Sequence, residues 1–131
     1  MEGFSTDCPV VLVTGAAKRI GAAVSCRFHE SGYRTLIHFN RSELEAEELY
    51  AKLNGLRADS AFLVRGDLND PSTLDTIVKE VTKLGRLDVL VNNASSFYPT
   101  PLEAANEVQW NDLMNSNLKS HMFMCKRLDK K

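Results

Sequence analysis

The chain has 131 residues, of which 44% are hydrophobic and 25% are charged, and its formal net charge is -1. This balance is typical of one soluble globular domain, and it gives no reason to expect nucleic acid or an anionic membrane as a partner. No apolar run approaches membrane-spanning length, and residues 1–9 lack the features of a secretory signal. We therefore expect a cytoplasmic protein.

The three cysteines and three histidines are dispersed along the chain. No two of them have a short metal-ligand spacing, so we predict buried or incidental thiols and no metal site.

Residues 9–21 predict a strand, a tight turn and a helix. An apolar run over 10–13 is followed by Gly15, and Gly21 arrives where an amphipathic helical pattern begins. Such a turn directs free backbone N–H groups and the positive end of the helix dipole at one spot, which suits a phosphate. Gly15 is expected to allow the turn, and Gly21 to allow close packing of the helix. The glycine pair alone fits an ordinary strand-to-helix connection equally well.

Arg19 stands where the familiar glycine-rich pattern has its middle glycine. An arginine in this turn can place a bidentate donor beside a phosphate or a polar substrate edge, at the expense of close backbone approach.

Hydrophobic periodicity predicts strands and helices that alternate along the rest of the chain. Further strands are expected over 35–39, 60–64 and 87–91, and helices over 20–31, 42–55, 70–85 and 106–125. We expect a capping box at 42–45 and an Asp-Pro helix start at 70–71. The pattern predicts an α/β fold, a Rossmann-like doubly wound parallel sheet of about four strands and four helices, in a single domain over 1–131. Ligands of such sheets bind outside the carboxyl ends of the strands.

The end of the second strand predicts the cofactor. An NAD-binding chain of this type has a carboxylate there for the ribose 2′-OH, whereas this chain has Asn40, Arg41 and Ser42. We therefore predict NADP(H), although a solvated arginine and a helix cap would explain each residue taken alone.

Five other polar or aromatic positions follow predicted strands or lie on the last predicted helix. Asp67 could accept from an amine such as that of adenine, or orient its own turn. Asn92 and Asn93 could brace neighbouring backbones and contact the cofactor. Phe97 could stack on a flat heterocycle or pin a loop. Asn117 could be a structural brace or part of a proton relay.

These residues resemble the short-chain dehydrogenase/reductase family, and more closely its pteridine reductase branch. The family usually has glycine where Arg19 and Ser95 stand. The matching stretches are Thr14–Gly21, Asn40–Ser42, Asp67–Leu68, Asn92–Ser95 and Ser96–Pro101.

The resemblance implies NADPH-dependent reduction of a pterin-like substrate. It implies that Phe97 stacks on the pterin, that Arg19 and Ser95 offer it polar contacts, and that Asn117 supports the proton relay. It also implies an NADPH site lined by Arg19, Ile20, Asn40, Arg41, Ser42, Asp67, Leu68, Asn93, Ala94 and Ser95. Full-length relatives are commonly tetramers, so a homo-oligomer is expected.

The family's catalytic Tyr-x-x-x-Lys pair has no match in the 131 residues. We therefore expect a chain truncated before that segment, which carries the cofactor-binding half of a reductase. Two alternatives stay open: a non-catalytic NADP(H)-binding or interaction module, and a short-chain carbonyl reductase of another substrate. The exact substrate also stays open.

Overall fold

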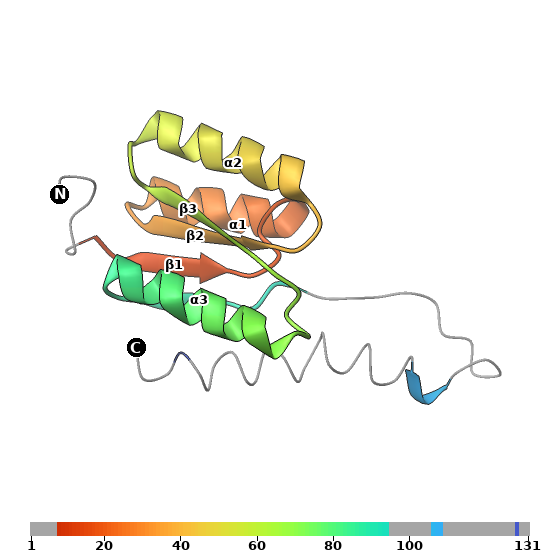
Figure 1. Cartoon of the computed structure of the whole chain (residues 1–131). Coiled ribbons are helices and arrows are strands. Elements are labelled where there is room, and N and C mark those ends of the chain that lie inside the picture. Colours follow the sequence, from red (N-terminus) through yellow and green to blue (C-terminus); the bar gives the residue numbers. More distant parts are fainter. Residues whose placement is uncertain (1–7, 95–105, 109–127, 129–131) are drawn as a thin grey trace.

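The structure is a computed structural model that describes residues 8–94, 106–108 and 128. Its centre is a sheet of four parallel strands in the order β3-β2-β1-β4 (Figure 1). The strands are β1 (Val10–Val13), β2 (Arg34–Phe39), β3 (Ala61–Arg65) and β4 (Val89–Val91). The connecting helices are α1 (Arg19–Glu30), α2 (Glu43–Leu56) and α3 (Pro71–Leu84). The predicted α/β class with a parallel sheet is confirmed, whereas most of the last predicted helix lies outside the described residues.

Helices cover both faces of the sheet, with α1 and α2 on one side and α3 on the other (Figure 1). Successive side chains of a strand point to opposite faces, so β1 contributes to both cores. Val10 and Leu12 pack in the cluster that contains the apolar side of α3, whereas Val11 and Val13 pack in the cluster that contains Leu53 of α2. All four residues of β1 are fully buried, which makes this strand the centre of the fold.

Local signals explain the ends of α3. The side chain of Asp70 accepts a hydrogen bond from the N–H of Ser72 at 3.0 Å, and Pro71 occupies the first turn. Gly85 ends the helix with a φ of 87°, in the left-handed region that glycine enters without steric cost.

The predicted capping box at the start of α2 is wrong. Ser42 occupies the N-cap position, but its side chain makes no capping hydrogen bond. Its backbone, at φ -87° and ψ 56°, departs from the extended conformation that directs an N-cap hydroxyl at the helix N–H groups. The Ser42 hydroxyl is therefore not used by the helix.

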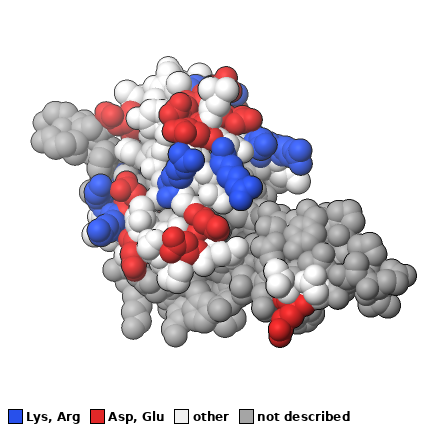
Figure 2. All heavy atoms as spheres, turned by 45° about the vertical axis from the view of Figure 1, so that its right-hand side comes forward, with Lys and Arg blue, Asp and Glu red and all other residues white. Residues whose placement is uncertain are grey.

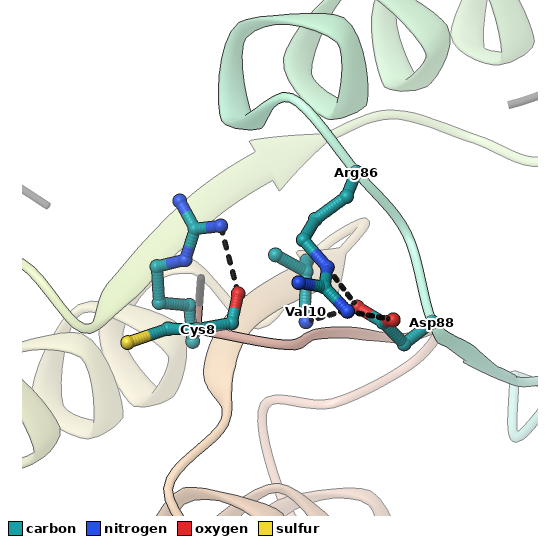
Figure 3. A network of polar contacts seen from close by, with 5 residues as sticks. Cys8, Val10, Arg86 and Asp88 are labelled. Carbon is teal, nitrogen blue, oxygen red and sulfur yellow. Dashed lines mark hydrogen bonds and ion pairs between the residues drawn. The ribbon is translucent and has the colours of Figure 1, made fainter. Parts of the chain in front are cut away.

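A polar network ties the amino ends of β1 and β4 together, at the edge opposite the carboxyl ends of the strands (Figure 3). Asp88 Oδ2 accepts hydrogen bonds from the N–H of Val10 and from Arg86 Nε, both at 2.8 Å. The hydrogen bond from Arg86 is the main cause that lowers the pKa of Asp88. Cys8, whose carbonyl accepts from Arg34 Nη2 at 2.9 Å, carries a free thiol. These contacts give this edge a structural role.

Candidate functional site

Thr14 joins the carboxyl ends of β1 and β4. Its hydroxyl oxygen accepts hydrogen bonds from the N–H groups of Asn93 and Ala94, at 2.9 and 3.0 Å. Its own N–H donates to the carbonyl of Val91 at 3.0 Å. The segment after β4 is therefore fixed against the turn that follows β1.

The turn between β1 and α1 is packed too closely for side chains at its glycines. Gly15 has a φ of 60°, and a Cβ there would lie 2.9 Å from Cα of Ala94. A Cβ at Gly21 would lie 2.3 Å from the carbonyl oxygen of Gly15 and 2.7 Å from Nδ2 of Asn93. Asn93 Nδ2 also donates to that carbonyl at 3.0 Å. The close packing expected at Gly21 and the bracing expected of Asn93 are both present.

His38, near the end of β2, holds the first N–H groups of the same turn. The N–H of Gly15 donates to His38 Nδ1 at 3.0 Å, and the N–H of Ala16 donates to the backbone carbonyl of His38 at 2.8 Å. These two N–H groups therefore serve the fold. The donors left for a ligand are those of the first turn of α1, because Lys18 at the N-cap offers no side-chain cap and the turn contains no acidic residue.

Arg19 begins α1 in a backbone conformation that usually belongs to glycine. Its φ is 57°, in the left-handed region that costs an ordinary residue about 1 kcal/mol. Its neighbour Ile20 is a large apolar side chain with 71% of its surface exposed. The left-handed backbone of Arg19 and the exposed side chain of Ile20 make this helix start a candidate ligand site.

Arg65 shapes the connection between β2 and α2. Its Nε donates to the carbonyl of Asn40 at 3.1 Å, its Nη1 pairs with Glu43 at 3.2 Å, and its guanidinium lies 5.8 Å from the ring centre of Phe39. Arg41, between these anchor points, is exposed and has no ion pair with another described residue. Among the described residues, Arg41 thus has no ion pair, and the hydroxyl of its neighbour Ser42 does not cap α2.

Asp67 follows the end of β3 and is exposed. Its Oδ1 accepts from the N–H of Asn69 at 2.9 Å, which is the turn-orienting role considered from the sequence. Leu68 packs against the core on the α3 side. Figure 2, turned so that the right-hand side of Figure 1 comes forward, shows basic side chains grouped between acidic ones.

The structure brings most of the sequence-predicted residues to one edge of the sheet. Gly15, Arg19, Ile20, Gly21, Asn93 and Ala94 surround the β1–α1 turn, and Asn40, Arg41, Ser42, Asp67 and Leu68 follow β2 and β3. Ser95, Phe97 and Asn117 lie outside the described residues.

Sequence reasoning missed Thr14 and His38. Two sequence features could have revealed them: Thr14 directly follows a buried apolar run, and His38 lies inside an apolar strand. A polar side chain buried at such a position must find hydrogen-bond partners. Over the described ranges, no group of three or more His, Cys, Asp or Glu side chains could hold a metal. Nor does any helix in those ranges have the length and apolar character to cross a bilayer.

Comparison with known proteins shows the family. The model of the short chain dehydrogenase family matches residues 9–130. The chain belongs to this family, whose members are oxidoreductases that use a nicotinamide nucleotide.

Curated relatives include proteins with two different activities. Pteridine reductase 1 of Leishmania tarentolae is 37% identical over 93% of this chain and 53% of the relative. The 3-oxoacyl-[acyl-carrier-protein] reductase FabG of Staphylococcus aureus is 33% identical over 87% of this chain and 46% of the relative. The chain thus spans about half the length of these relatives.

Proposed function

We propose that the carboxyl edge of the sheet binds NADP(H) and that the chain is the cofactor-binding half of a pterin-reducing enzyme. The observation that carries the proposal is the pair Arg41 and Ser42 at the end of β2. The guanidinium has no described ion pair, the hydroxyl caps no helix, and no carboxylate stands between them and β2. An arginine and a hydroxyl would bind a 2′-phosphate, and the missing carboxylate removes the usual partner of a free ribose 2′-OH.

The start of α1 fits the pyrophosphate. The N–H groups of Arg19, Ile20 and Gly21 have no acceptor within α1 and lie at the positive end of the helix dipole, and the first turn holds no acidic side chain to compete for them. The lack of a Cβ at Gly15 and Gly21 lets the helix start pack against the end of β4. The remaining carboxylate oxygen of Asp67 would accept from the adenine amine.

The pterin assignment is supported by Arg19. The chain holds an arginine in a left-handed conformation that glycine adopts without steric cost, which fits a ligand-binding role for this side chain. We propose that it bridges the cofactor phosphate and the substrate, and that Ser95 and Phe97 contact the same substrate. The similarity to Pteridine reductase 1 supports this assignment.

NADPH would supply the hydride, and the protein's described residues would bind and orient the nucleotide. We further propose that Asn117 supports a proton relay, that the protein is cytoplasmic, and that it forms homo-oligomers.

The similarity to FabG favours a second candidate, an NADPH-dependent reductase of a carbonyl substrate. Phe97→Ala separates the two, since a loss restricted to pterin binding is expected only if Phe97 stacks on a pterin. If the 131 residues instead act as a non-catalytic module, NADPH binds without turnover of either substrate class.

The proposed preference for NADP(H) is tested by titrating the 131-residue chain with NADPH and NADH in parallel. We expect NADPH to bind at least about tenfold more tightly, since a charge-assisted contact to the 2′-phosphate contributes about 1.5–3 kcal/mol. Arg41→Ala should abolish this preference. Arg27→Ala, an exposed arginine that pairs with Glu30 at the other end of α1, is the matched control and should keep it. Equal affinities for both nucleotides in the unmodified chain would refute the NADP(H) assignment.

A further inference from the structure

His38 is a buried histidine with both ring nitrogens engaged. Only 2% of the residue is exposed. Nδ1 lies 3.0 Å from the N–H nitrogen of Gly15, and Nε2 lies 2.8 Å from the carbonyl oxygen of Gly66. A carbonyl only accepts, so Nε2 carries the proton, and an N–H only donates, so Nδ1 is bare. The geometry selects the neutral imidazole with its proton on Nε2.

The ring connects two strand ends on either side of its own. Gly15 opens the turn into α1, and Gly66 follows β3 and precedes Asp67. The backbone adds to both links, because the carbonyl of His38 accepts from Ala16 and the N–H of Gly66 donates to Phe39 at 3.0 Å. His38 thus fixes the spacing between the helix start proposed for the pyrophosphate and the carboxylate proposed for the adenine.

Protonation of His38 would break this arrangement. A second ring N–H would face the N–H of Gly15, replacing an accepted hydrogen bond by two opposed donors in a buried site. Burial is the main cause that lowers the pKa of His38, and the hydrogen bond to Gly66 and the charge of Asp67 oppose it. The neutral form is therefore the one present at neutral pH.

The charged groups near His38 lie on the β3 side and at the start of α1. β1 supplies none, since residues 10–14 contain no titratable side chain. On the β3 side, the charge of Asp67 favours the protonated ring of His38, whereas the guanidinium of Arg65 contacts Asn40 and Glu43. At the start of α1, Lys18 and Arg19 are exposed to solvent.

We infer that His38 is a positioning residue for the nucleotide site, and that its protonation releases the β1–α1 turn and weakens NADP(H) binding in acid. This inference rests on the proposed function of the site. Because the protein covers the ring of His38, protonation of the ring would act on nucleotide binding through the shape of the β1–α1 turn.

The test measures NADP⁺ binding to the 131-residue chain by calorimetry between pH 8 and pH 5. The 2′-phosphate itself titrates with a pKa of about 6, so its contribution is common to every variant and cancels in comparisons. His38→Asn keeps an oxygen acceptor where Nδ1 stands and removes the titration. His38→Leu removes both hydrogen bonds.

His29 provides the matched control. It is equally buried, its pKa is also lowered by burial, and its Nε2 contacts Ser60 at 2.6 Å at the far end of α1 from Arg19. His29→Gln keeps a donor there and should leave the pH profile of NADP⁺ binding unchanged.

Once the pH falls below the lowered pKa of His38 in the free chain, we expect the affinity of the unmodified chain to fall more steeply than that of His38→Asn, by up to about tenfold per pH unit. His38→Leu should bind about tenfold more weakly at pH 7.5. Nitrogen-15 NMR of the ring should show a bare Nδ1 and a protonated Nε2 at pH 7.5. A proton on Nδ1, or identical pH profiles for the unmodified chain and His38→Asn, would overturn the inference while leaving NADP(H) binding intact. No binding at any pH would instead overturn the proposed function together with the inference.

Discussion

The side-chain amide of Asn93 donates a hydrogen bond of 3.0 Å to the carbonyl oxygen of Gly15. This contact joins the segment after β4 to the turn after β1, although the two residues are 78 positions apart. It leaves no room for a side chain at Gly21, whose Cβ would lie 2.3 Å from the same carbonyl. The helix start is therefore positioned by the fold before any ligand arrives, which lowers the ordering cost of binding.

Gly21→Ala is expected to destabilise the chain by about 2 kcal/mol or more, because the added methyl group forces the turn and Asn93 apart. Gly55→Ala, inside α2, is the matched control, since a Cβ there meets nothing within 4 Å. It should be neutral or stabilise by up to about 1 kcal/mol, because alanine is the better helix former. Urea denaturation measures both. Similar effects of the two substitutions would contradict the packing described for Gly21.

Arg19→Gly is expected to act in opposite directions on stability and on binding. Removal of the left-handed strain should raise the free energy of unfolding by up to about 1 kcal/mol. Loss of the guanidinium should weaken NADPH binding, and calorimetry on the same protein measures this.

Asp59→Gly is the control for Arg19, since Asp59 is the other described non-glycine residue with a positive φ, at 55°. It lies in the α2–β3 connection, and replacing it should leave NADPH binding unchanged. If Arg19→Gly bound NADPH as tightly as the unmodified chain, the guanidinium of Arg19 would have no role in NADPH binding.

Sequence patterns were sufficient to predict the strands and helices but not the contacts between them. The strand over 10–13 and the helix over 71–84 are signalled by local residues, an unbroken apolar run in one case and Asp70, Pro71 and Gly85 in the other. The roles of Thr14 and His38 depend on partners 23 to 80 positions away, which no local pattern reveals. Ser42 shows the converse, since its local cap signal was overridden by the backbone of the loop.

Stability should decrease in mild acid because of the two buried histidines. Both pKa values are lowered, so below pH 6.5 the unfolded chain binds protons that the folded chain does not. Their contribution is complete above pH 6.5 and is lost as the pH falls, by up to about 1.4 kcal/mol per pH unit for each histidine. Denaturation of His29→Gln and His38→Asn between pH 5 and pH 8 should show a shallower slope in each. If neither variant changed the slope of unfolding free energy against pH, the lowered pKa values of His29 and His38 would be contradicted.

Asp88→Asn should lower the free energy of unfolding at pH 7 by about 1 kcal/mol, since it removes a partly exposed, charge-assisted contact with Arg86. The pKa of Asp88 is lowered, so this stabilisation is present above the ordinary value of 3.8 and is lost as the pH falls below it. The difference between the variant and the unmodified chain should therefore shrink toward pH 2. Glu47→Gln, at an exposed position on α2, should have no comparable effect.

The most direct test of the central claim is a map of backbone amide chemical shifts while NADP⁺ is added to the 131-residue chain. We expect shifts at the carboxyl edge of the sheet, in the amides of Gly15, Arg19, Ile20, Arg41 and Asp67, with little change at Val10 and Asp88 on the opposite edge. Shifts centred on Val10 and Asp88, or none at the carboxyl edge at saturating nucleotide, would contradict it.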